Sequence, residues 1–146
     1  MIEENELLPL TEPTAETLAN WRALDYFTRG YLTAAFWTND NGAPSGEYTA
    51  TDRPELFFAN LSPEALAMAK RDCEKFQSEN SEALELCGRD SEQSGQDFWL
   101  TREGHGAGFW DGRCHEPHGD TLTAAAEKFG TADFYQGDNG KFYFMR

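Results

Sequence analysis

Bulky apolar residues recur at helical spacing over residues 14–38, and this pattern constrains the fold more than any other feature of the sequence. Thr11 or Thr14 can cap such a helix, and Pro13 suits its first turn. Gly30 lowers helix propensity by about 1 kcal/mol relative to alanine, so it indicates either a close helix crossing or a kink. The apolar surface extends around the cylinder, which predicts a helix that is buried on several sides or that binds a partner, including a second copy in a homodimer. Its apolar positions are Leu18, Trp21, Leu24, Tyr26, Phe27, Tyr31, Leu32 and Phe36.

The middle of the chain predicts a second long helix. Turn-forming residues end the first helix, and we expect residues 43–61 to form an irregular connection. The second helix begins at Ser62-Pro63-Glu64, where a cap, a proline and an acid follow one another in the favoured order, and it frays before Gly88. The segment 89–96 is polar and acidic, so we expect it to be flexible.

Two hairpins are predicted in the last third of the chain. Residues 97–101 and 109–111 are rich in aromatic side chains and flank a glycine-rich turn, which predicts a hairpin over 97–112. Residues 132–135 and 141–145 alternate in polarity around a Gly-Asp-Asn-Gly turn, which predicts the second hairpin.

Together these elements predict a single α+β domain over residues 1–146. A short helix over residues 120–129 separates the two hairpins, so residues 97–146 would form a ββαββ unit with an antiparallel sheet. The helical part, residues 13–88, would pack its two helices on one face of that sheet. Residues 1–12 would form an irregular arm.

Negative charge is concentrated in the first two thirds of the chain. The formal net charge is −14; residues 1–100 hold 19 acidic and 7 basic residues, whereas residues 101–146 hold 7 and 5. Such a field repels phosphate backbones over a Debye length of about 8 Å, so direct duplex DNA binding is disfavoured. It attracts proteins with a basic surface, although the same charge can simply keep a protein soluble. The predicted partner-binding residues are Asp72, Glu74, Glu79, Glu82 and Glu85.

The chain also carries signals about its compartment. Its first residues are acidic, the opposite of the basic start of a signal peptide, and no apolar run approaches the length of a membrane span. Three cysteines make an odd number without a framework spacing, which favours thiols in a reducing compartment. We therefore expect a cytoplasmic protein.

The glycine-rich segment after residue 102 is the strongest candidate for a binding site. Its glycines allow close backbone approach, so its N–H groups could bind an anionic ligand, with His105 as a donor or an acid–base group. Alternatively, the glycines only allow a tight hairpin whose aromatic residues pack the core. The segment is not a P-loop, because the lysine and the following Ser/Thr are missing. The candidate ligand-binding residues are Arg102, His105, Gly106, Gly108, Asp111 and Arg113.

A metal site is not predicted, although Cys114, His115 and His118 are three soft ligands within five residues. Structural zinc usually needs four ligands in two separated pairs, and the chain has no second pair. No nucleotide-binding fingerprint or recognised hydrolase motif occurs, so we predict no cofactor and no catalytic residues.

Several stretches resemble a known family. Residues 97–102 (DFWLTR) and 104–111 (GHGAGFWD), together with residues 27–37 and the Gly-Asp-Asn-Gly-Lys turn, are similar to a widespread family of small acidic proteins encoded by bacteriophages and prophages. Members carry a basic residue directly after the Trp-Asp pair, whereas here Gly112 precedes Arg113. No catalytic activity is established for the family, so the resemblance implies an accessory phage protein that acts in the infected bacterium.

The leading functional hypothesis is a non-enzymatic, phage-encoded protein of the host bacterial cytoplasm. It would bind and inhibit a host nucleic-acid-processing or defence protein through its acidic helical surface. One alternative is a protein that sequesters a small anionic ligand or nucleotide at the glycine-rich segment. A second alternative is a small hydrolase that uses His105 and Asp111, and a third is a structural role in the virion.

Overall fold

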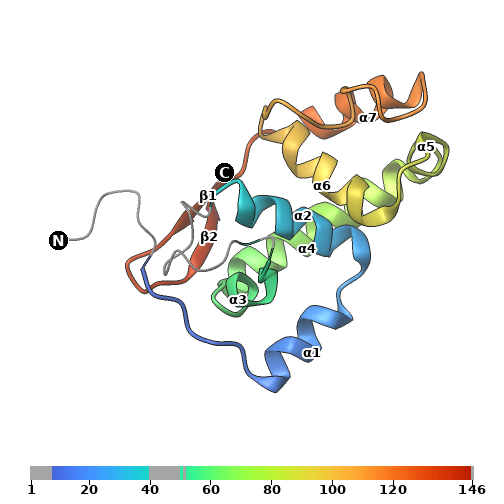
Figure 1. Ribbon diagram of the computed structural model, residues 1–146. Helices are drawn as coiled ribbons and strands as arrows, with labels where there is room; N and C mark the ends of the chain where they lie inside the picture. Colours follow the sequence, from blue (N-terminus) through green and yellow to red (C-terminus); the bar gives the residue numbers. More distant parts are fainter. Residues whose placement is uncertain (1–7, 40–49, 51, 146) are drawn as a thin grey trace.

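The computed structural model describes residues 8–39, 50 and 52–145 (Figure 1). Within these ranges the chain forms seven helices and one two-stranded antiparallel sheet. The predicted α+β fold with a ββαββ sheet is therefore wrong: among the described residues only the last hairpin forms strands, and the fold is predominantly helical. In chain order the elements are α1 (Ala15–Ala23), α2 (Tyr26–Trp37), α3 (Pro54–Ala59), α4 (Pro63–Glu79), α5 (Ser81–Cys87), α6 (Ser91–Arg102), α7 (His118–Glu127), β1 (Asp133–Gln136) and β2 (Phe142–Met145).

The first predicted hairpin, over residues 97–112, is instead the second half of α6 and the loop that follows it. A capping box starts α6: the Asp90 carboxylate accepts the backbone N–H of Gln93, and the Gln93 side chain accepts the N–H of Asp90. The helix then continues through the buried residues 98–100. A short apolar run of this kind is compatible with a buried helix as well as with a strand, so the sequence pattern alone does not separate the two. The segment 89–96, predicted to be flexible, thus contains the start of this helix.

Gly104 ends α6 at the point where the sequence predicts a hairpin turn. Its φ of +73° lies in the left-handed region, which glycine adopts without strain. The N–H of Gly104 donates to the carbonyl of Thr101 over 3.2 Å, and the N–H of His105 donates to the carbonyl of Leu100 over 3.0 Å. These two bonds form the Schellman motif, a common way of closing a helix.

The predicted helix over residues 14–38 divides into α1 and α2. The break falls at Asp25, whose carboxylate caps the start of α2 by accepting a backbone N–H. A further helix, α3, lies in the connection 43–61 that the sequence predicts to be irregular. Residues 43–49 and 51 of that connection lie outside the described residues.

The second predicted helix starts as expected but is divided. The Ser62 hydroxyl accepts the backbone N–H of Ala65, which confirms the predicted cap. Asn80 then separates α4 from α5, and its side-chain amide donates to the carbonyl of Phe76 over 2.9 Å. The short helix and the second hairpin near the C-terminus are confirmed as α7 and as β1 paired with β2.

Helices α2 and α6 cross at two glycines. A Cβ atom built on Gly30 would lie 2.0 Å from the carbonyl oxygen of Glu92, and one built on Gly95 would lie 1.9 Å from that of Phe27. Each glycine therefore lies against the backbone of the other helix. Of the two explanations that the sequence leaves open for Gly30, the close crossing is confirmed.

Aromatic rings fill the core around this crossing. The ring of Phe76 on α4 stacks on Phe98 of α6 with centroids 4.2 Å apart, and Phe134 of β1 stacks on Phe142 of β2 at 5.0 Å. The arm reaches the hairpin, because the N–H of Leu8 donates to the Gln136 side chain; residues 1–7 lie outside the described residues. In the part of the chain that the structure describes, no helix has the length and apolar character needed to cross a membrane.

Candidate functional site

Arg102 is buried in the core rather than exposed beside the glycine-rich segment. Its guanidinium donates to the Asp72 carboxylate over 2.9 Å and to the Tyr31 hydroxyl over 3.0 Å. It also donates to the backbone carbonyls of Phe129 and Gly130. Arg102 and Asp72, which the sequence assigns to two different surfaces, thus form one buried ion pair that joins α4, α6 and the end of α7.

The loop after α6 folds back onto that helix. The N–H of Phe109 donates to the Thr101 hydroxyl over 3.1 Å, and a Cβ at Gly108 would lie only 2.2 Å from the same oxygen. The Phe109 ring is buried and stacks on Phe76. Trp110, in contrast, is 51% exposed. Within the motif 97–111, Gly108 and Phe109 therefore have a structural role, although not in a hairpin.

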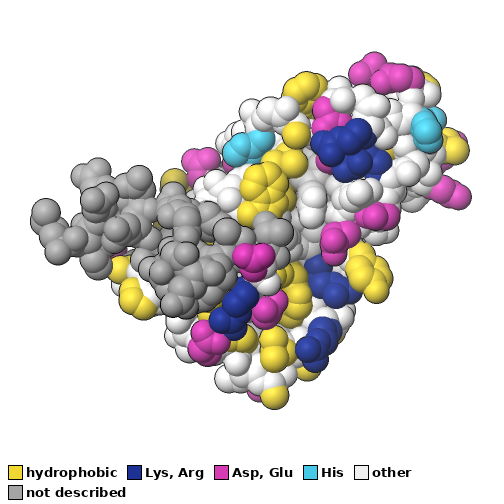
Figure 2. Space-filling view, in the orientation of Figure 1, with side chains coloured by type: hydrophobic (Ala, Val, Ile, Leu, Met, Phe, Trp, Pro, Cys, Tyr) yellow, Lys and Arg dark blue, Asp and Glu magenta, His cyan; other side chains and the backbone are white. Residues whose placement is uncertain are grey.

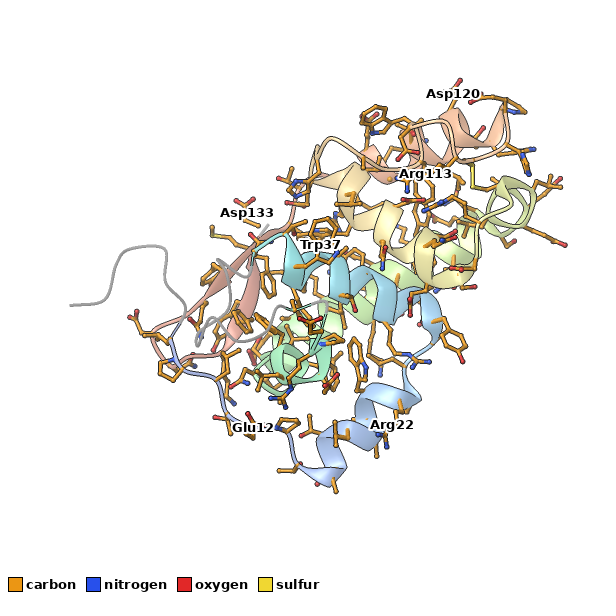
Figure 3. All side chains as sticks on the ribbon, viewed as in Figure 1. Glu12, Arg22, Trp37, Arg113, Asp120 and Asp133 are labelled. Atoms are coloured by element: carbon orange, nitrogen blue, oxygen red, sulfur yellow. A yellow bond between two sulfur atoms is a disulfide. The ribbon has the colours of Figure 1, made fainter. Side chains whose placement is uncertain are left out.

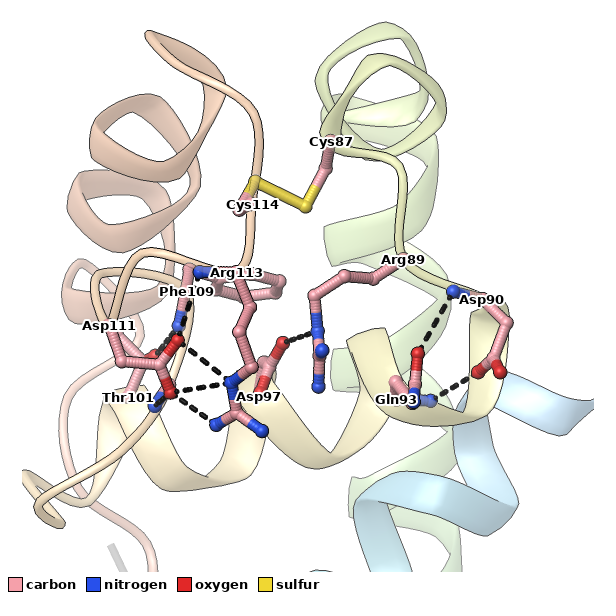
Figure 4. Close-up of polar contacts among 11 residues, drawn as sticks. Cys87, Arg89, Asp90, Gln93, Asp97, Thr101, Phe109, Asp111, Arg113 and Cys114 are labelled. Carbon is pink, nitrogen blue, oxygen red and sulfur yellow. Dashed lines mark hydrogen bonds and ion pairs between the residues drawn. A yellow bond between two sulfur atoms is a disulfide. The ribbon is translucent and has the colours of Figure 1, made fainter.

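Asp111 and Arg113 form an ion pair next to this loop (Figure 4). The Arg113 Nε lies 3.1 Å from each carboxylate oxygen of Asp111, and the backbone N–H groups of Gly108 and Arg113 also donate to this carboxylate. These bonds, above all those from the Arg113 side chain, lower the pKa of Asp111 from its usual 3.8 to about 2.

This shift predicts an acid-sensitive contribution to stability. A carboxyl group whose pKa is lowered in the folded state stabilises the fold above its unfolded pKa, and this stability is lost as the pH falls toward the folded pKa. We expect the native protein to lose more stability between pH 3.8 and about 2 than the Asp111→Asn variant loses over the same interval. Urea denaturation of both proteins across this interval measures the difference, and equal losses would contradict the expectation.

Asp97 forms a second ion pair near the first. Its carboxylate is buried and accepts a hydrogen bond from Arg89 Nε over 2.8 Å, and Figure 4 shows Arg113 close to it on the other side. Burial raises the pKa of Asp97, and the two arginines act against that shift. The sequence does not predict a role for Arg89, because it lies in the segment 89–96, predicted to be flexible. The only local sign of the helix there is the cap residue Asp90.

A disulfide joins Cys87 at the end of α5 to Cys114 in the loop before α7 (Figure 4). The expectation of three thiols is therefore wrong for these two residues, while Cys73 is a buried thiol. The cysteines thus no longer favour a reducing compartment. The backbone N–H of His115 also donates to the carbonyl of Cys87 over 2.9 Å. Together the two links fix the start of α7 against the end of α5.

The remaining candidate residues of the glycine-rich segment stay near the surface. His105 is half-buried, and Gly106 is exposed, with no atom that would restrict an added Cβ. His115 is exposed and His118 is half-buried. No three His, Cys, Asp or Glu side chains of the described residues come together as a metal site requires.

Four of the five predicted partner-binding carboxylates are exposed, whereas Asp72 is buried. Glu74 and Glu79 lie on α4, beside basic residues of the same helix. Glu82 and Glu85 lie on α5, which carries no basic residue. Basic side chains therefore offset the negative charge on α4, whereas none offsets it on α5.

An acidic end forms where α5 and α7 lie side by side (Figure 1). The nearby arginines Arg89 and Arg113 are each paired with an aspartate. On the face drawn in Figure 2, acidic side chains lie along the margin of this end, and Asp120 extends outward from α7 in Figure 3. Among the described residues, none of its carboxylates forms an ion pair. The acidic end consists of Glu82, Glu85, Asp90, Glu116 and Asp120, all exposed.

Comparisons with known proteins do not assign this arrangement to a family. No family model, no curated protein and no solved structure matches the chain.

Proposed function

We propose that the protein binds a partner with a basic surface through its acidic end. In this proposal it is a non-enzymatic accessory protein of phage or prophage origin that inhibits a host nucleic-acid-processing or defence protein. The observation that carries the proposal is the set of five exposed carboxylates without an ion pair in the described residues. Such a charged surface accelerates encounter with a basic partner and makes binding sensitive to salt.

The acidic end is held in place by links between its elements. The Cys87–Cys114 disulfide joins α5 to the segment before α7, and the capping box fixes the first turn of α6. A surface that is already ordered loses little conformational entropy when it binds, which favours its use as an interface.

The alternatives at the glycine-rich segment have less support. A ligand site there would use two arginines, but Arg102 is bound to core groups and Arg113 is bound to Asp111. A hydrolase would need His105 and Asp111 to act together. The Asp111 carboxylate is instead bonded to Arg113 and Gly108, and none of the hydrogen bonds of the described residues joins it to His105.

Charge reversal at the acidic end tests the proposal. We expect the double variant Glu82→Lys/Glu85→Lys to bind a basic partner at least about tenfold more weakly than the native protein, a loss of about 1.4 kcal/mol. The matched control is Glu16→Lys/Glu64→Lys, which changes the net charge equally at exposed positions in the first turns of α1 and α4.

The measurement is affinity capture from a bacterial lysate at low salt, followed by a salt titration of each captured protein. The proposal expects a basic partner that the native protein and the control retain and that the α5 variant loses. If the native protein captures no basic partner, or if the two variants lose it equally, the acidic end is not the interface.

A further inference from the structure

A hollow lined by basic side chains lies between α4 and the C-terminal end of α7. Its volume is about 500 Å³, within the range of pockets that hold small molecules. Its main lining residues are Arg71, Lys75, Glu79, Asn80, Lys128 and Phe129.

Positive charge gathers in this hollow although the chain as a whole is strongly acidic. Three of the chain's 12 basic residues line it, namely Arg71, Lys75 and Lys128. Lys75 and Lys128 form no ion pair among the described residues. Of the two acids in the lining, Asp72 pairs with the buried Arg102 at 2.9 Å and with Arg71 at 3.5 Å. The other acid, Glu79, therefore faces the two lysines.

The local structure directs these cations to one place. Arg71 and Lys75 are four residues apart on α4, so they lie on the same side of that helix. Lys75 Nζ lies 5.8 Å from the centre of the Phe129 ring, which forms an apolar wall. That ring is held edge-on against Phe98 with centroids 5.1 Å apart. The buried Phe98 therefore holds the Phe129 ring in position as one wall of the hollow.

The buried Arg102 makes the position more favourable for an anion. The last carbonyls of a helix carry partial negative charge, which would repel a negatively charged ligand at the end of α7. In the last turn of α7, the carbonyls of Ala126 and Glu127 already accept the N–H groups of Phe129 and Gly130 over 3.1 Å each. Arg102 binds the carbonyls that follow the helix, those of Phe129 and Gly130, over 3.2 Å and 2.8 Å.

From this geometry we infer that the hollow between α4 and α7 binds a small phosphorylated ligand. A phosphate group needs several cationic donors, and an arginine with two lysines supplies them from two elements. Phe129 offers an apolar surface for the organic part of such a ligand. The site is separate from the acidic end and from the glycine-rich segment, so it stands or fails independently of the proposed function.

The test uses inorganic pyrophosphate and adenosine 5′-diphosphate as probes, by calorimetry on the full chain at about 0.15 M salt. We expect saturable binding that Lys75→Ala/Lys128→Ala weakens at least about tenfold, because it removes both unpaired cations. The matched control is Lys70→Ala/Lys141→Ala, which removes the same charge at exposed positions outside this hollow and should change affinity less than about twofold.

The two probes also distinguish the kind of ligand. Tighter binding of the diphosphate nucleotide indicates a nucleotide-like ligand whose base lies on Phe129, and equal binding indicates that the phosphates alone are recognised. A second readout is the backbone amide spectrum, in which Lys128 and Phe129 should shift on titration. No saturable binding of either probe, or equal weakening by the control, would overturn the inference.

Discussion

Replacing Arg102 with methionine is expected to lower the free energy of unfolding by about 4 kcal/mol, because it leaves the Asp72 carboxylate without its buried counter-ion. Asp72 is only 2% exposed, so its carboxylate cannot turn to water. The substitution also removes the donor to the Tyr31 hydroxyl and to the carbonyls of Phe129 and Gly130. The loss should appear as a lower urea midpoint with an unchanged slope.

Arg71→Met is the matched control for this prediction. Arg71 approaches the same Asp72 carboxylate at 3.5 Å, but its side chain is 63% exposed, so its removal should change stability by less than about 1 kcal/mol. A double variant, Asp72→Asn with Arg102→Met, removes the buried carboxylate charge as well and should recover part of the loss. Equal effects of Arg71→Met and Arg102→Met would show that the buried pair is not the source of the stability.

Local signals in the sequence were sufficient for the parts of the fold that they control. The cap at Ser62 and the Gly-Asp-Asn-Gly turn each fix a nearby backbone geometry, and the structure has α4 and the β1–β2 hairpin at those places. The prediction failed at residues 97–101, where several apolar residues follow one another directly. Such a run has no period that separates a strand from a buried helix. The deciding signal was the capping box at Asp90, seven residues earlier.

The candidate site was harder to predict because its pairs are distant in the sequence. Arg102 and Asp72 are thirty residues apart, and no local pattern indicates that they meet. The Glu103 side chain, directly after α6, likewise accepts the backbone N–H of Ala132, directly before β1. The charge count located the excess of carboxylates in the first two thirds of the chain. The count could not show that basic residues lie beside the carboxylates of α4, whereas the carboxylates of α5 form no ion pair among the described residues.

The glycines at the crossing of α2 and α6 lead to the second large effect. Glycine to alanine in an ordinary helix interior raises stability by about 1 kcal/mol, since alanine has the higher helix propensity. Here the sign should reverse. A Cβ at Gly95 would lie 1.9 Å from the carbonyl oxygen of Phe27, and one at Gly30 would lie 2.0 Å from that of Glu92. Backbone atoms cannot rotate away as a side chain can, so the two helices must separate.

We therefore expect Gly95→Ala and Gly30→Ala each to destabilise the protein by about 3 kcal/mol, the upper end of the usual range for overpacking a core. Gly106→Ala is the matched control, because an added Cβ there meets no atom within 4 Å, and its effect should stay within about 0.5 kcal/mol. Urea denaturation followed by circular dichroism measures all three variants. Because moving α6 disturbs the packing of Phe98 against Phe76, the near-ultraviolet spectrum should change in the two crossing variants only. A stabilising effect of either crossing substitution would mean that α2 and α6 do not approach as closely as their glycines permit.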